Sequence, residues 1–235
     1  MKKNTRVIWK DSLRQLTVTG FLTPSVNIKT GDMLQAMVSP VSVSPISGMA
    51  TGTSHNGCDT CPVKKACYVN PRMPQAVWKA SRGQEPVNFL TAVQGAARAA
   101  AAETPIRLGS WGDIATVPLN VTESLLTTTT WTRRAWPGYT HMWSRPSVAL
   151  DYRRLLMASV ESSEGRAQAK EKGFRTFRIL PAGAKLETGE VLCPYYSSDG
   201  TVKCRDCRLC DGARPNDKRK DIAVHVHGSR KGNLS

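Results

Sequence analysis

The seven cysteines of this chain fall into two groups whose spacings are typical of metal sites rather than of disulfides. In the C-terminal group, three cysteines are separated by two residues each, and a fourth is followed directly by proline. Its members are Cys193, Cys204, Cys207 and Cys210. Bacterial ferredoxins hold iron–sulfur clusters with a similar run of C-x₂-C spacings and a cysteine–proline pair. The spacing therefore favours a closed [4Fe–4S] cluster, with a structural zinc ion as the alternative.

The N-terminal group has the pattern H-x₂-C-x₂-C-x₅-C, formed by His55, Cys58, Cys61 and Cys67. Three thiolates can hold three irons of a [4Fe–4S] cluster and leave the fourth iron open to a small molecule. The same thiolates can also bind zinc, with His55 completing a Cys₃His tetrahedron. The sequence leaves both interpretations open for this group.

The cysteine pattern and the N-terminus indicate a cytoplasmic protein. Thiols stay reduced in the cytoplasm, where C-x₂-C spacings are more often metal sites than disulfides. No apolar signal-peptide core follows Met1-Lys2-Lys3, and no stretch reaches the roughly 18 apolar residues that suggest a membrane span. We therefore expect no membrane partner.

The formal net charge is +15, from 33 Lys and Arg residues against 18 Asp and Glu residues. A charge of this size favours polyanionic partners such as DNA or RNA. Basic residues are also frequent around the C-terminal cysteines: Arg205, Arg208, Arg214, Lys218, Arg219 and Lys220. They can offset the charge of a thiolate-bound cluster or contact phosphates. A zinc-stapled, basic nucleic-acid-binding protein is thus the second hypothesis.

Strand and helix patterns alternate through the middle of the chain, which predicts an α/β fold with a parallel sheet, arranged as a partial (β/α) barrel. We expect an irregular or edge-strand segment at 1–57, the partial barrel with the three-cysteine site at 58–180, and a four-cysteine segment with a final strand and basic tail at 181–235. Expected strands are 105–110, 138–143, 155–160, 174–180 and 222–227; expected helices are 74–82, 87–103, 121–128, 147–154 and 162–172.

Polar residues follow the expected strands at their carboxyl ends, where open α/β sheets and barrels bind ligands. The candidates for catalysis are Asp113, His141 and Glu161. Those for substrate binding are Ser110 and Arg178. Because these ends meet at one edge of a parallel sheet, we expect the five side chains to converge on one charged small molecule.

The chain resembles a family of cysteine-rich proteins without an established activity, carried by bacteriophages, plasmids and integrated elements. The likeness rests on residues 27–35, 58–70, 108–118, 138–143, 157–160, 176–178 and 193–212. More distantly, an early three-cysteine group, a partial barrel and a late second cluster are similar to radical-SAM enzymes. Those enzymes typically use C-x₃-C-x₂-C, whereas this chain has C-x₂-C-x₅-C, which counts against S-adenosylmethionine binding. The leading hypothesis is a mobile-element iron–sulfur protein with this layout.

Overall fold

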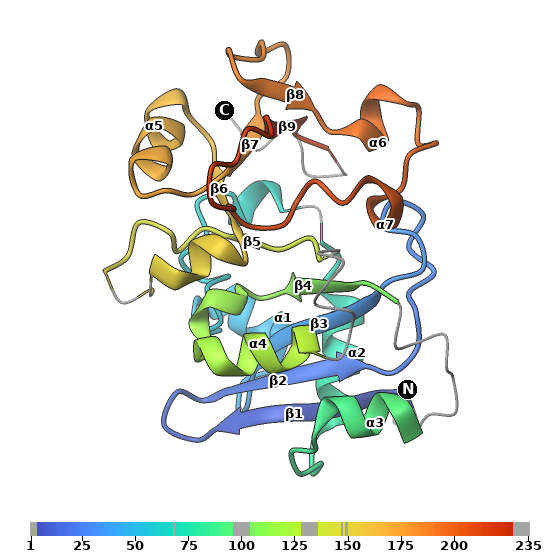
Figure 1. Ribbon diagram of the computed structural model, residues 1–235. Coiled ribbons are helices and arrows are strands. Elements are labelled where there is room, and N and C mark those ends of the chain that lie inside the picture. Colours follow the sequence, from blue (N-terminus) through green and yellow to red (C-terminus); the bar gives the residue numbers. More distant parts are fainter. Residues whose placement is uncertain are drawn as a thin grey trace.

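A computed structural model describes residues 4–67, 69–95, 104–127, 136–146, 148 and 150–227. The fold is mixed α/β, with two sheets that follow one another along the molecule (Figure 1). The first sheet has the order β1-β2-β3-β4. Its strands are β1 (Thr5–Asp11), β2 (Leu16–Phe21), β3 (Leu34–Pro40) and β4 (Ile106–Trp111).

Strand β3 is the central element of the first sheet. It pairs antiparallel with β2 and parallel with β4, and all of its residues are buried. Ala36 and Val38 pack in the main core, while Met37 packs on the opposite face against Val77 and Trp111. The expectation of irregular or edge structure is therefore wrong for this segment. A strand buried on both faces shows a continuous apolar run without alternation.

The second sheet consists of five parallel strands in the order β5-β6-β7-β9-β8. They are β5 (Tyr139–Thr140), β6 (Met157–Val160), β7 (Thr176–Leu180), β8 (Glu190–Leu192) and β9 (Asp221–His225). The predicted parallel sheet is confirmed. Leu108 N of β4 donates a hydrogen bond to Pro137 O at 3.0 Å, so the two sheets meet just before β5. The described residues form no closed barrel.

Helices cover both faces of the first sheet. The α-helices are α1 (Pro45–Thr51), α2 (Arg72–Ser81), α3 (Phe89–Gly95), α4 (Leu119–Thr127), α5 (Ser163–Glu171), α6 (Pro194–Ser197) and α7 (Cys204–Cys207). In Figure 1, α3 and α4 lie in front of the first sheet and α1 and α2 lie behind it. No helix among the described residues is long and apolar enough to cross a membrane.

Most predicted helices are confirmed, with two differences. The expected helix 87–103 is seen as α3, and its residues 96–103 lie outside the described part of the chain. In place of the expected helix 147–154 there is a 3₁₀ turn, η5 (Leu150–Arg154). Helix α5 begins as the sequence predicts, because Ser162 Oγ accepts a hydrogen bond from Gly165 N.

Candidate metal-binding sites

The four C-terminal cysteines, Cys193 and the three in residues 204–210, line one pocket. Cys193 precedes α6, Cys204 and Cys207 begin and end α7, and Cys210 follows in the next loop. The same pocket is lined by Lys29, Pro137, Tyr139, Pro194, Tyr195, Val202, Arg208 and Leu209. We call it the four-cysteine pocket. The fold thus brings together the thiols that the sequence spacing selected.

The thiols of the four-cysteine pocket act on one another electrostatically. Burial, with smaller contributions from the neighbouring Cys193, Cys204 and Cys207, raises the pKa of Cys210 to about 12. Burial also raises the pKa of Cys204, with additional contributions from Cys193 and Cys207. Crowded, buried thiolates are costly unless a bound cation neutralises them. A thiophilic metal or cluster would supply that compensation.

The loop after β2 holds α7 in place. Lys29 O accepts a hydrogen bond from Cys204 N, and Thr30 O accepts one from Arg205 N, each at 3.1 Å. Lys29 Nζ lies 4.5 Å from the centroid of the Tyr196 ring. In Figure 1 this blue loop rises beside α7. Lys29 was missed as a site residue, because its proximity to Cys204 depends on a contact between distant segments.

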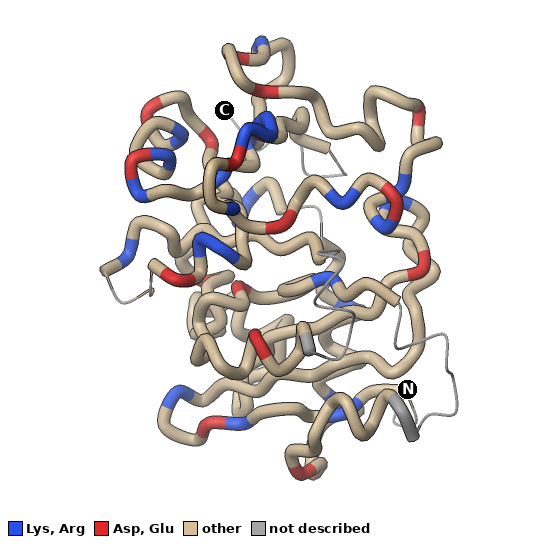
Figure 2. Tube along the Cα trace, in the orientation of Figure 1, with Lys and Arg blue, Asp and Glu red and all other residues tan. Residues whose placement is uncertain are grey.

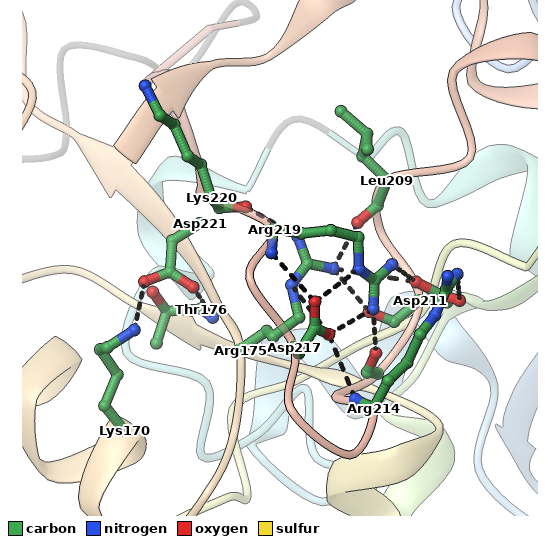
Figure 3. A network of polar contacts seen from close by, with 11 residues as sticks. Lys170, Arg175, Thr176, Leu209, Asp211, Arg214, Asp217, Arg219, Lys220 and Asp221 are labelled. Carbon is green, nitrogen blue, oxygen red and sulfur yellow. Dashed lines mark hydrogen bonds and ion pairs between the residues drawn. The ribbon is translucent and has the colours of Figure 1, made fainter. Parts of the chain in front are cut away.

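Beyond Cys210, a network of polar contacts centred on Arg175 anchors the chain (Figure 3). Arg175 Nη1 donates to Leu209 O at 2.5 Å and to Asp211 O at 3.1 Å, and its Nη2 donates to Lys220 O at 2.8 Å. Arg175, directly before β7, therefore holds both the residues around Cys210 and the residue before β9.

Two basic residues that were candidates for phosphate contact are engaged in the same network. Arg219 pairs with Asp211 and with Asp217, and Arg214 pairs with Asp211 at 2.8 Å. Elsewhere, Lys and Arg are spread over both sheets with acidic residues among them (Figure 2). Arg214 and Arg219 therefore serve the structure of this loop.

Asp217→Asn is expected to destabilise the protein at neutral pH. Burial alone would raise the pKa of Asp217, but hydrogen bonds and the charge of Arg219 hold it well below its usual value. A carboxyl group with a lowered folded-state pKa adds stability above its unfolded pKa of about 3.9. That stability is lost as the pH falls through the folded value. We expect a loss of roughly 1–3 kcal/mol at neutral pH.

Urea denaturation of Asp217→Asn and wild type at neutral pH and below about pH 4 measures this effect. The difference between the two proteins should shrink as the pH falls. Asp206→Asn is the control, because Asp206 is largely exposed and its contact with Arg205 is 3.7 Å long. A difference that stayed constant over the pH range would contradict the role of the ionised carboxylate.

The three-cysteine loop, residues 58–67, lies beside the carboxyl ends of β4 and β5. Burial raises the pKa of Cys58 to about 12, and Cys61 and Cys67 add to the increase. His55 is exposed in the preceding turn. The imidazole next to the loop is instead that of His141, whose Nδ1 lies 3.7 Å from Cys61 Sγ. His55, the candidate fourth ligand for zinc, is exposed, while the ring of His141 contacts Cys61.

Asp113 is buried at the end of β4, where hydrogen bonds occupy both of its carboxylate oxygens. Oδ2 accepts from His141 N at 2.8 Å and from Thr140 Oγ1 at 3.0 Å, and Oδ1 accepts from Ala115 N at 3.0 Å. Its own N–H donates to Asn56 O at 2.7 Å. Asp113 therefore joins β4, β5 and the turn before Cys58. These hydrogen bonds give this predicted catalytic residue a structural role.

The other predicted strand-end residues divide into two sets. His141 Nε2 lies 2.9 Å from Glu161 Oε1, so the ends of β5 and β6 meet as expected. Ser110 Oγ instead donates to Ala36 O within the first sheet. Arg178 is paired with Glu190, the first residue of β8, and with Glu187 just before it. The five residues therefore do not converge on one ligand; His141 and Glu161 are the pair that the fold brings to the three-cysteine loop.

The electrostatics of His141 follow from these two neighbours. Burial lowers the pKa of the imidazole, but hydrogen bonding and charge from Cys61 and Glu161 outweigh it and raise the pKa to about 10. The ring thus lies between the sulfur of Cys61 and the carboxyl group of Glu161. It is suited to carry positive charge next to the cysteine sulfur.

Within the described residues, no three His, Cys, Asp or Glu side chains lie close enough together to hold a metal ion. The seven cysteines therefore remain proposed ligands, supported by donor type, spacing and shared surroundings. Comparison with known proteins finds no matching family, curated protein or solved structure.

Proposed function

We propose that this chain is an iron–sulfur protein with two cysteine-bound centres. The observation that carries the proposal is the four-cysteine pocket, because Cys193 and the three thiols of residues 204–210 line one cavity. Four thiolates are the complete ligand set of a closed [4Fe–4S] cluster. Zinc bound by the same thiols is the alternative. Such a centre has no open position, so its role is structural or in electron transfer.

The three-cysteine loop is proposed as the reactive centre. It follows β3, and its neighbours Asp113 and His141 follow β4 and β5, so it lies at the carboxyl edge where parallel α/β sheets bind ligands. A cluster held there by three thiolates would offer one open iron to a small molecule. In this arrangement Glu161 orients His141, and Asp113 fixes the backbone at His141.

This layout supports a radical-SAM-like enzyme in a phage or plasmid setting, as the resemblance implies. The support is the order of elements: a three-cysteine loop after the first parallel strand, further parallel strands, then a second cysteine centre. The cysteine spacing differs from that of radical-SAM enzymes, so the reaction and substrate are left unassigned.

The experiment is anaerobic purification or reconstitution of the full chain with iron and sulfide. We expect absorbance at about 400 nm from thiolate-bound clusters. Cys204→Ser/Cys207→Ser should abolish one centre and Cys58→Ser/Cys61→Ser the other, each removing roughly half of the iron. Ser197→Ala is the control, because its hydroxyl contacts only Pro194 O beside the pocket. Stoichiometric zinc without iron in the wild type would contradict the proposal.

Nucleic-acid binding is a second candidate function, supported by the net charge of +15. Electrostatic binding releases counterions, so affinity should fall steeply with salt, with a slope of about −0.9 per phosphate contacted on duplex DNA. Fluorescence anisotropy with labelled duplex DNA and single-stranded RNA at increasing salt measures this. Absence of binding at low salt would rule out the candidate. Arg214→Gln should leave any binding unchanged, because Arg214 is paired with Asp211.

A further inference from the structure

We infer that His141 is the positioning residue of the three-cysteine centre, holding Cys61 through a hydrogen bond to its sulfur while Glu161 holds the ring. The inference rests on the proposed function, because it assumes that Cys61 binds a cluster. It adds a specific role for His141 and Glu161: the pair orients one ligand sulfur and sets its charge environment.

The geometry fixes His141 at three points. Its Nδ1 lies 3.7 Å from Cys61 Sγ, within the range of a hydrogen bond to sulfur. Its Nε2 lies 2.9 Å from Glu161 Oε1, and its backbone N donates to Asp113 Oδ2 at 2.8 Å. Both edges of the ring and its backbone are therefore held, and the ring has little freedom to turn away from Cys61.

This arrangement matches the way in which proteins support metal ligands. A carboxylate commonly accepts one imidazole N–H and so determines the direction of the other ring nitrogen. Here Glu161 has that position, and the other nitrogen meets a thiol. An ionised thiolate and an ionised carboxylate are both acceptors, so the ring N–H groups can serve both.

The loop receives similar support from β4. The backbone N–H of Gly112, next to Asp113, lowers the pKa of the Cys58 thiol, although burial raises that pKa overall. Gly112, which follows β4 in the first sheet, and His141, which follows β5 in the second, thus each act on one sulfur of the three-cysteine loop. Repeated N–H contacts to sulfur are a means by which proteins adjust iron–sulfur clusters.

The consequence is a higher reduction potential for the cluster. A hydrogen bond to a ligand sulfur withdraws electron density from the thiolate and stabilises the reduced, more negative state. His141 and Glu161 are partly exposed, with side-chain accessibilities of 22% and 28%. The pair can therefore also meet a small molecule bound next to the loop, whereas Asp113 and Ser110 are occupied by buried hydrogen bonds.

The test compares His141→Phe, His141→Gln and Glu161→Gln in the full chain carrying Cys204→Ser/Cys207→Ser, so that only the three-cysteine centre is observed. Midpoint potentials are measured by EPR-monitored titration with dithionite, and bound iron is counted. We expect His141→Phe to keep its iron but to have a lower potential. His141→Gln should recover part of the shift because its amide can donate, and Glu161→Gln should lie between wild type and His141→Phe.

His55→Phe is the matched control, because His55 is an exposed histidine near the same loop. Pulsed EPR of ¹⁵N-histidine-labelled full chain with all its cysteines provides a test that needs no variant: a weak nitrogen coupling to the cluster is expected. An unchanged potential in His141→Phe with iron bound would overturn the inference. The inference would also be overturned if His141→Phe lost the cluster and His141→Cys kept it, because that result would identify residue 141 as a direct ligand.

Failure of the proposed function is distinguishable from failure of this inference. If the wild type binds no iron and sulfide, the proposed function fails. The contact between His141 and Cys61 is then tested in metal-free protein by the rate at which iodoacetamide alkylates Cys61. That rate should differ several-fold between His141→Phe and wild type, because the ring contacts the Cys61 sulfur in the wild type. An equal alkylation rate in the two proteins would show that His141 does not contact Cys61 either.

Discussion

Arg175→Lys is expected to unfold the loop around Cys210 and to weaken the four-cysteine pocket. Arg175 is only 4% exposed, and its guanidinium donates to the carbonyl oxygens of Leu209, Asp211 and Lys220. A lysine ammonium cannot reproduce this planar set of donors. Each buried carbonyl left unpaired costs about 1–3 kcal/mol, so we expect a total loss of roughly 2–5 kcal/mol.

Urea denaturation with fluorescence detection measures the loss of stability, and iron content after anaerobic reconstitution measures the effect on the pocket. Arg154→Lys is the control. Arg154 is half-exposed and pairs with Glu123 at the surface, where such pairs contribute about 0–1 kcal/mol. An Arg175→Lys variant with wild-type stability and full iron content would show that the network does not support the pocket.

Gly112→Ala is expected to be the most destabilising glycine substitution near the three-cysteine loop. Gly112 has φ +73°, a left-handed conformation that is strained for alanine. An added Cβ would also lie 2.3 Å from Val38 O and 3.0 Å from Asn56 Nδ2. The backbone of β3 and the turn before Cys58 would have to move. Strain and overpacking together should cost roughly 2–5 kcal/mol.

Gly83→Ala is a closely matched control. Gly83 has the same φ of +73°, but an added Cβ would meet nothing within 4 Å. Its substitution should cost only the conformational strain of about 1 kcal/mol. Comparing the two unfolding free energies separates strain from the clash with β3. Equal losses would mean that the backbone around Gly112 relaxes freely.

Much of the fold could be predicted from local patterns. Helices α2 and α5 and strands β4, β6, β7 and β9 lie where apolar periodicity and capping residues placed them. The parallel order of the second sheet follows from the alternation of strands and helices. Strand β3 could not be assigned in this way, because a strand buried on both faces lacks the alternation that identifies half-buried strands.

The candidate sites were predictable in part. The grouping of Cys193 with Cys204, Cys207 and Cys210 was correct in that these residues line one pocket. Sequence order suggested His55 as the histidine at the N-terminal group, but the fold places His141 beside Cys61. Strand-end positions alone did not separate Glu161, which meets His141, from Arg178, which pairs with Glu190.

The sequence by itself determined the chemistry that is available: seven thiols in two spaced groups, a parallel sheet, and polar residues at the strand ends. Only the tertiary structure decided which of these groups meet. Lys29 lies at α7, Arg175 holds the Cys210 loop, and His141 lies between Cys61 and Glu161. The physical reason is that such contacts join segments far apart in the chain. They depend on sheet order and on buried hydrogen-bond partners, which short-range spacing does not record.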